Sequence, residues 1–217
     1  MLDTYHTIKS PTEGIFRDRG SKFIAYAFPV FNESDWQDAL SSVKKLHPKA
    51  RHHCYAYRIG TDKNNYRAND DGEPSGTAGR PILGRIDSYG LSNVIVIVVR
   101  YFGGTLLGAS GLINAYKEST HLALETAKII EKKVKNIYAI SFDYSLMSDV
   151  MNAIKKLNIE ITHQEFEISA LIKIAIQKSL SEETLNKLRA TIAKVRMDEE
   201  EIWKNIPGLE IEFQQTI

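Results

Sequence analysis

The chain has 217 residues, of which 43% are hydrophobic and 25% are charged, and its formal net charge is +1. This composition is ordinary for a soluble globular protein, and the length allows one large domain or two small ones. The longest apolar run, Val94–Val99, is too short to span a bilayer, and residues 1–6 have no basic and apolar leader pattern. The single cysteine, Cys54, excludes an internal disulfide. We therefore expect a cytoplasmic protein.

The first fifty residues predict a hairpin followed by a helix. Ile15–Arg19 and Phe23–Phe31 are expected to pair across Gly20-Ser21. Ser34 and Gln37 have the spacing of a capping box, which favours a helix start at this point. The apolar stripe of this helix comprises Trp36, Leu40, Val43 and Leu46.

The next segment predicts two strands and a second helix. His53–Ile59 alternates in the manner of a strand with one buried face. A turn at Asp62–Asn65 then leads into a short strand at Tyr66–Ala68. A helix is expected from Thr77 or Gly79 to about Ser88, since a proline in its first turn loses no helical hydrogen bond.

Asn93–Tyr101 is predicted to be the central strand of the first half. Its six uninterrupted apolar residues require burial on both faces. A long helix is expected from Ser110 to about Lys133. Its inward stripe comprises Leu112, Tyr116, Ser119, Leu122, Ala123, Thr126 and Ile130.

The second half predicts the order β-α-β-β-α-β, which is typical of a ferredoxin-like domain. The acidic residues after Ser181 suit the positive end of its second helix. In chain order the six elements are Ile137–Tyr144, Leu146–Leu157, Ile159–Glu167, Ala170–Gln177, Ser181–Val195 and Leu209–Gln214.

A polar, basic stretch at Lys132–Asn136 marks the expected boundary between two domains, residues 1–134 and 135–217. The first domain holds 18 Lys and Arg against 14 Asp and Glu, a net charge of +4, whereas the second holds 10 against 13, a net charge of −3. A basic domain beside an acidic one indicates that the first faces a polyanion.

The most unusual segment is Asn69–Pro81, which holds three carboxylates, three glycines and two prolines. Such a loop is either a solvated connection or a binding surface. Its carboxylates can bind Mg²⁺ or act as acid and base, and they can equally cap turns and the following helix. The candidate binding residues are Asp70, Asp71, Glu73, Ser75, Thr77 and Arg80.

A second glycine-rich segment, Tyr101–Gly111, follows the central strand. A strand, a glycine turn and a helix start place free backbone N–H groups where an anion can bind, although the glycines can also serve tight packing alone. The spacing matches no Walker A loop, dinucleotide fingerprint or hydrolase elbow. The candidate binding residues are Arg100, Tyr101, Gly103, Gly104 and Ser110.

The run Arg51–Cys54 places histidines beside the cysteine. Neighbouring strand residues point to opposite faces, so Cys54 shares a face with His52 and not with His53, and a buried structural thiol is favoured over a nucleophile. Arg51, His52 and His53 are candidates for binding phosphate or an acidic surface. The aromatic rings that could stack on bases, or pack in the core, are Tyr55, Tyr57, Tyr66 and Tyr101.

Three strings resemble the YigZ/IMPACT family: Arg51–Tyr57, Asn69–Leu83 and Val98–Gly108, within a similarity that spans about Gly14–Lys128. The second half resembles the smaller C-terminal domain of bacterial YigZ-type members. The resemblance implies an α+β first domain with a left-handed β-α-β crossover, as in elongation factor G domain IV and the GHMP kinases. It also implies a ferredoxin-like second domain, similar to elongation factor G domain V. The left hand departs from the usual rule for such crossovers.

The resemblance also implies a function. IMPACT proteins act in translational control by competing for a large ribosome-associated regulator, and two domains similar to the tip of a translocase imply contact with RNA or the ribosome. We therefore expect a binding protein rather than an enzyme, with no cofactor or metal. Its first domain would contact RNA, the ribosome or a translation factor.

Two alternatives remain open. One is a phosphate- or nucleotide-dependent enzyme that uses the glycine-rich cleft, with Asp70, Asp71 or Glu73 binding Mg²⁺ or acting as the base. The other is a protein-interaction module whose acidic second half, including Asp198–Glu201, binds a basic partner.

Overall fold

The computed structural model describes residues 3–62, 64–167 and 170–217. It divides into two compact units: the first is Thr4–Lys132, and the second comprises Lys133–Ile217 together with Asp3. Lys63, which belongs to the predicted turn before the short strand, lies outside the described residues. Within the described ranges no helix is both long and apolar enough to cross a membrane.

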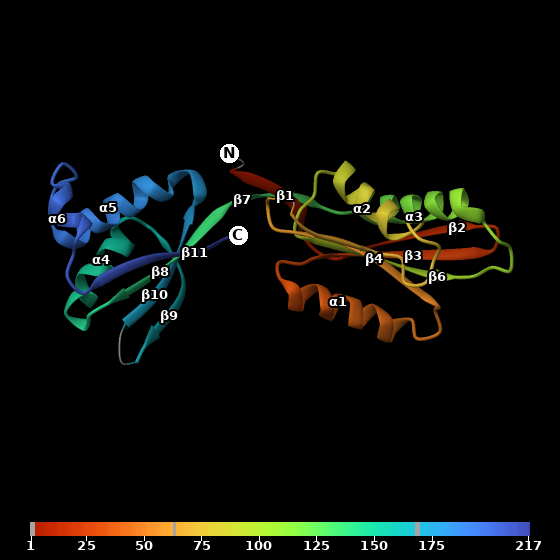
Figure 1. Ribbon diagram of the computed structural model, residues 1–217, viewed down its shortest axis with the longest axis horizontal. Helices are drawn as coiled ribbons and strands as arrows, with labels where there is room; N and C mark the ends of the chain where they lie inside the picture. The colour runs from red at the N-terminus through yellow and green to blue at the C-terminus, as the bar shows by residue number, and fades with distance from the viewer. Residues whose placement is uncertain (1–2, 63, 168–169) are drawn as a thin grey trace. The chain divides into compact units, whose positions relative to one another are not determined.

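The first unit is a sheet with helices on both faces. Its elements are β1 (Thr4–Ile8), β2 (Thr12–Asp18), β3 (Ser21–Pro29), α1 (Glu33–Leu46), β4 (His52–Ile59), β5 (Asn65–Asn69), α2 (Gly79–Ser88), β6 (Val94–Tyr101), α3 (Gly108–Glu125) and β7 (Ile129–Lys133). The five-stranded sheet has the order β2-β3-β6-β4-β5, so β6 is central, as predicted. Figure 1 shows α1 on one face of this sheet and α2 with α3 on the other.

Two hydrophobic cores sandwich this sheet. β3 and β4 both pair antiparallel with β6, so they run parallel to each other, and α1 crosses between them. Tyr55 and Tyr57 pack under α1, whereas Cys54 and Ala56 pack on the side of α2 and α3. The α+β class is confirmed. The expectation that His53–Ile59, now part of β4, buries only one face is wrong, because helices cover both sides of the sheet.

The long helix predicted to reach Lys133 ends at Glu125. The Thr126 hydroxyl donates to the carbonyl of Ala123 at 3.1 Å, and the chain then forms β7, which pairs with β1 in a two-stranded sheet. Neither strand was predicted from the sequence. The apolar residues continue at helical spacing through Ile130, but this segment instead forms β7 and pairs with β1 at the start of the chain.

Two local predictions near the start of the chain are corrected. The cap of α1 is Asn32, whose side chain accepts a hydrogen bond from the Asp35 N–H at 3.0 Å, so Ser34 lies inside the helix. The hairpin turn is Arg19-Gly20, with φ of 44° and 78°. Positive φ at both central residues matches the right-handed twist of the flanking strands.

The second unit has the predicted ferredoxin-like arrangement. Its elements are β8 (Lys135–Phe142), α4 (Met147–Lys156), β9 (Glu160–Phe166), β10 (Ala170–Gln177), α5 (Ser181–Ala193), α6 (Glu200–Lys204) and β11 (Leu209–Thr216), with short 3₁₀ turns at Tyr144–Leu146 and Lys178–Leu180. The antiparallel sheet has the order β11-β8-β10-β9. Helix α6, which buries Trp203, was not predicted.

The start of α5 also differs from expectation. The Ser181 hydroxyl donates to the carbonyl of Gln177 at 3.2 Å, so it does not cap the N–H groups of the helix. The helix ends at Ala193, where Lys194 has a φ of 60°, two residues before the predicted end at Val195.

Candidate functional site

The loop Asn69–Pro81 is held by its first carboxylate. Asp70 Oδ2 accepts from the N–H of Gly76 at 2.8 Å, and Oδ1 accepts from the N–H groups of Ala78 at 3.0 Å and Gly79 at 2.8 Å. The last two donors open α2, so Asp70 caps this helix from outside it. Burial opposes ionisation of Asp70, but the three N–H donors outweigh it and lower the pKa of the carboxyl group.

Glu73 closes a buried network beneath the loop. Arg100 Nη1 donates to its two carboxylate oxygens at 2.7 and 2.9 Å, and the Tyr116 hydroxyl donates to Oε1 at 2.8 Å. The Cys54 thiol donates to the carbonyl of Asp70 at 3.0 Å and lies 3.3 Å from the Tyr116 hydroxyl. Burial raises the pKa of the Cys54 thiol, which therefore stays protonated and has a structural role.

Asp71 ties the loop to β4. Its Oδ2 accepts from the backbone N–H of His53 at 2.7 Å, and its carbonyl accepts from His52 Nδ1 at 2.8 Å. His53 is buried, its Nε2 donates to the carbonyl of His47 at 3.2 Å, and burial lowers its pKa. Because a carbonyl can only accept, Nδ1 of His52 carries a proton, and in the neutral form of the ring Nε2 is an acceptor.

All three carboxylates of this loop therefore have partners inside the fold. Among residues 3–62, 64–167 and 170–217, no group of three His, Cys, Asp or Glu side chains could hold a metal ion. Of the other predicted residues, Thr77 is buried and its hydroxyl donates to the carbonyl of Pro74 at 2.6 Å. Ser75 and Arg80 are exposed.

The second glycine-rich segment depends on a close approach of two backbones. A Cβ on Gly103 would lie 1.9 Å from the carbonyl carbon of Gly20, and the Gly103 N–H donates to Ser21 Oγ at 3.1 Å. Gly104 follows with a φ of 88°. Helix α3 then begins without a side-chain cap or an acidic residue in its first turn, where Ser110 is exposed.

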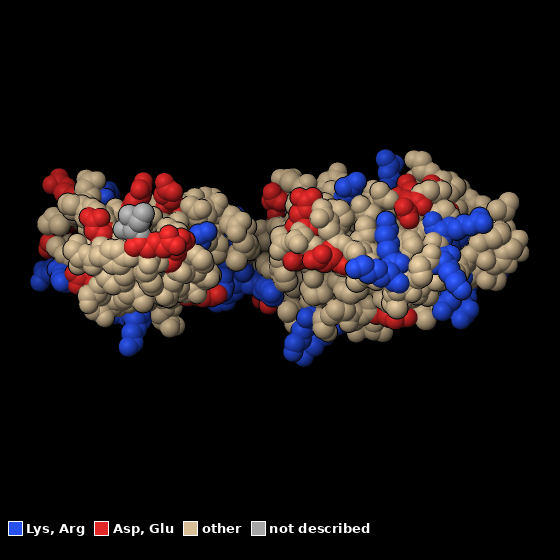
Figure 2. All heavy atoms as spheres, turned by 90° about the horizontal axis from the view of Figure 1, so that it is seen from below, with Lys and Arg blue, Asp and Glu red and all other residues tan. Residues whose placement is uncertain are grey.

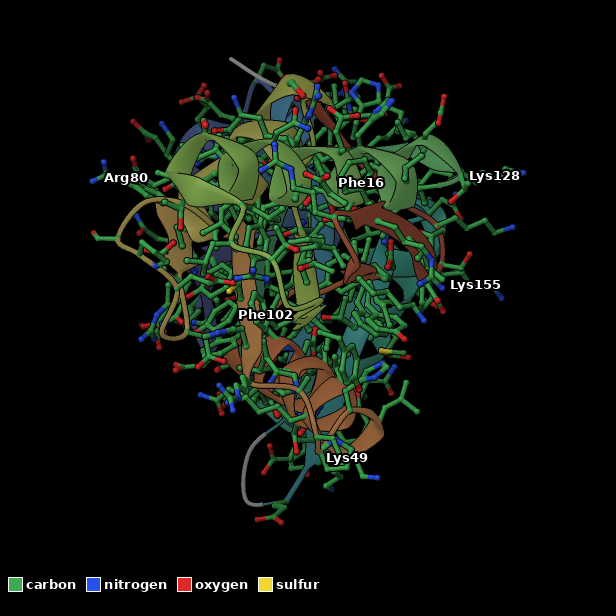
Figure 3. All side chains as sticks on the ribbon, turned by 90° about the vertical axis from the view of Figure 1, so that its right-hand side faces the viewer. Phe16, Lys49, Arg80, Phe102, Lys128 and Lys155 are labelled. Atoms are coloured by element: carbon green, nitrogen blue, oxygen red, sulfur yellow. The ribbon has the colours of Figure 1, made fainter. Side chains whose placement is uncertain are left out.

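A groove of about 640 Å³ opens beside this turn. The turn follows β6 at the right-hand end of the first unit in Figure 1. The groove is lined by Lys49, Arg51, His52, Arg100, Tyr101, Phe102 and Leu106. In Figure 3, which looks onto this end, Arg80 lies at the edge, apart from Phe102 and Lys49. Four predicted residues, Arg51, His52, Arg100 and Tyr101, therefore meet here.

Sequence reasoning missed three residues of the groove: Lys49, Phe102 and Leu106. Phe102 is 54% exposed and Leu106 is 82% exposed, so both present apolar surface to solvent. Their position in the sequence was a signal of this exposure, because a glycine-rich turn cannot bury apolar side chains. Lys49 gave no signal beyond its place just after a helix. Figure 2 shows Lys and Arg side chains gathered toward the right-hand end of this unit.

The predicted tyrosines have different environments. Tyr55 and Tyr57 are buried in the core under α1, and Tyr66 is exposed outside the groove with the Arg58 guanidinium 5.1 Å from its ring centre. Tyr101 lines the groove, and its hydroxyl lies 3.0 Å from His47 Nδ1. His47 Nε2 lies 2.8 Å from the hydroxyl of Tyr26, so Tyr101 is held by a chain of hydrogen bonds.

Comparisons with known proteins match this arrangement. Residues 19–124 match the Impact N-terminal domain. Over 156 residues the chain is 38% identical to the IMPACT family member YvyE of Bacillus subtilis, a match that covers 72% of each chain. It is 35% identical to an IMPACT family member of Haemophilus influenzae over 167 residues, which are 75% of this chain and 80% of that one. A crystal structure described as that of a hypothetical protein aligns over 97% of both chains, with a TM-score of 0.76 and 25% identity.

Proposed function

Because the chain belongs to the IMPACT family, we propose that its first unit binds RNA through the groove beside β6, as part of a role in translational control. The observation that carries this proposal is the lining of the groove, where Lys49 and Arg51 lie with Tyr101 and Phe102. Cations that contact phosphates and rings that stack on bases are the two components of a groove for single strands.

The charge of the groove lining favours a polyanion such as RNA over a neutral or cationic ligand. Lys49 and Arg51 are exposed, and the groove lining, as the structure describes it, contains no Asp or Glu. Of the acids beside the groove in the described ranges, Glu73 is buried and paired with Arg100, and the Asp71 carboxylate accepts from the backbone N–H of His53. The groove therefore presents positive charge to solvent, and this charge attracts a polyanion over a distance of about 8–10 Å at physiological salt.

The engagement of the carboxylates favours binding over catalysis. A phosphate- or nucleotide-dependent enzyme would need Asp70, Asp71 or Glu73 free to bind Mg²⁺ or to accept a proton. Asp70 caps α2, Asp71 fixes β4, and Glu73 neutralises Arg100. Each would have to leave a structural partner before it could act on a ligand.

The family supports the setting in translation. The resemblance of the first half to IMPACT proteins, which act in translational control, supports a role for this chain with RNA on or near the ribosome. The buried thiol of Cys54 is consistent with the reducing cytoplasm in which translation takes place.

The test is the salt dependence of RNA binding by matched variants. Lys49→Ala/Arg51→Ala removes two charges from the groove, whereas Arg80→Ala/Lys128→Ala removes two charges from the edges seen in Figure 3. We expect salt-sensitive binding, and we expect the groove variant to reduce the slope of log K against log salt by about 1.4, since each phosphate contact on a single strand contributes about 0.7. The control should retain the wild-type slope. Equal losses in the two variants would refute the groove as the RNA site.

A further inference from the structure

Arg100 holds a buried donor at the groove. Its side chain is 8% exposed, and its Nε has no hydrogen-bond partner among the described residues. The ion pair with Glu73 runs through Nη1, and the guanidinium carbon lies 5.5 Å and 5.6 Å from the ring centres of Phe23 and Phe102. The side chain is therefore fixed on several sides. A buried N–H without a partner is costly, and it belongs to a side chain that lines the groove.

His52 adds a fixed acceptor to the same lining. Its Nδ1 donates to the carbonyl of Asp71 at 2.8 Å, which fixes the tautomer of the neutral form so that Nε2 bears the lone pair. A phosphate offers only acceptors at neutral pH, and it would satisfy Arg100 but not this nitrogen. The edge of a nucleobase offers donors and acceptors side by side, which suits Arg100 and His52 together.

Phe102 supplies an exposed ring beside these groups. It is 54% exposed, and the following residue, Gly103, packs its backbone against Gly20 and donates to Ser21 Oγ at 3.1 Å. This contact fixes the turn that carries the ring. A preset aromatic ring in solvent stacks on a base at little cost in conformational entropy.

We propose that the groove holds an unpaired nucleotide of single-stranded RNA, with its base stacked on Phe102 and the edge of the base facing the Arg100 side chain and His52 Nε2. The flanking phosphates contact Lys49 and Arg51. The groove volume of about 640 Å³ lies within the range of small-ligand pockets, about 300–1,000 Å³. A-form duplexes hide the faces of their bases, so paired RNA cannot use the ring. This inference rests on the proposed RNA-binding function and specifies the form of RNA.

The experiment compares one sequence of RNA as a labelled single strand and as a duplex, by fluorescence anisotropy with the full chain. We expect the single strand to bind at least about tenfold more tightly. Phe102→Ala should weaken single-strand binding by about tenfold and leave duplex binding unchanged. Phe102→Trp should retain the affinity. Phe31→Ala, which truncates a ring that is 46% exposed elsewhere on the unit, is the matched control and should have no effect.

Two results would overturn this inference in different ways. If both RNA forms bind equally and Phe102→Ala behaves like Phe31→Ala, while Lys49→Ala/Arg51→Ala still weakens binding, the groove binds RNA phosphates without an unpaired base. In that case the proposed function stands and this inference fails. If neither RNA form binds at low salt, both fail. Thermal unfolding of each variant verifies that the compared proteins are folded.

Discussion

The two glycine-rich segments of the first unit differ in what their polar groups contact. In Asn69–Pro81 the carboxylates accept hydrogen bonds from the helix start, from β4 and from the buried Arg100. In Tyr101–Gly111 there is no acid, α3 starts without a side-chain cap, and Phe102 stays in solvent. The density of polar residues alone therefore does not identify a binding surface, because the richer segment uses its groups to stabilise the fold.

The largest expected effect is a loss of stability when Glu73 of the segment Asn69–Pro81 is changed. Glu73→Gln leaves the buried charge of Arg100 without a counter-charge, so we expect it to lower the free energy of unfolding by about 3–5 kcal/mol in urea denaturation. The double variant Glu73→Gln/Arg100→Met removes both charges and should recover part of this loss. If the double variant loses at least as much free energy of unfolding as the two single variants lose together, Glu73 and Arg100 do not stabilise each other as a pair.

Within Tyr101–Gly111, Gly103 is a residue that stabilises the fold. Its Cβ would lie 1.9 Å from the Gly20 carbon, so Gly103→Ala should lower the free energy of unfolding by up to about 3 kcal/mol. The matched control is Gly84→Ala within α2, where a Cβ meets nothing within 4 Å. Alanine is the better helix former, so this control should raise stability by about 0.5–1 kcal/mol. Equal destabilisation by both changes would contradict the close approach of the two backbones.

Asp70→Asn tests the cap and gives a pH dependence. The amide accepts the three N–H groups less strongly than the carboxylate, and we expect a loss of about 1–2 kcal/mol at pH 7. The folded pKa of Asp70 is lowered, so its contribution is present above the unfolded pKa of about 3.9 and is lost as the pH falls through the folded value.

The difference in urea midpoint between wild type and Asp70→Asn should therefore shrink as the pH falls from 5 toward 3. A difference that stays constant over this interval would mean that the charge of Asp70 does not stabilise the loop.

The smallest effect is expected at Ser75, which the sequence suggested as a binding residue. It is exposed and lies outside the groove lining. Ser75→Ala should change the free energy of unfolding by less than about 0.5 kcal/mol and leave RNA affinity within error. A clear loss of RNA affinity in this variant would extend the binding surface onto the acidic loop.

Strong periodic segments made much of the fold predictable. The apolar run of β6 indicated a central strand, and the element order of the second half indicated the ferredoxin-like sheet. The β1–β7 pairing was not predictable, because it joins segments more than a hundred residues apart and the helical period continued into β7. Helix α6 is too short to give a periodic signal.

The candidate site was predictable in part. The chemistry of Arg51 and Arg100 was visible in the sequence, and the fold brings both to one groove. Whether a carboxylate is free depends on its partners, and those of Glu73 lie 27 and 43 residues away. Phe102 was overlooked although an apolar residue in a glycine-rich turn is a signal of exposure, and the sequence does not show the packing of Gly103 on Gly20, a contact between distant segments that fixes this turn.

The most direct test of the central claim is an RNA anisotropy titration of two folded variants, Asp70→Asn and Lys49→Ala/Arg51→Ala. We predict that Asp70→Asn, although less stable, binds single-stranded RNA as wild type does. The groove variant, with wild-type stability, should bind at least about tenfold more weakly, since it loses two phosphate contacts. The opposite pattern, with RNA affinity lost in Asp70→Asn and kept in the groove variant, would make the acidic loop the binding surface and contradict the account.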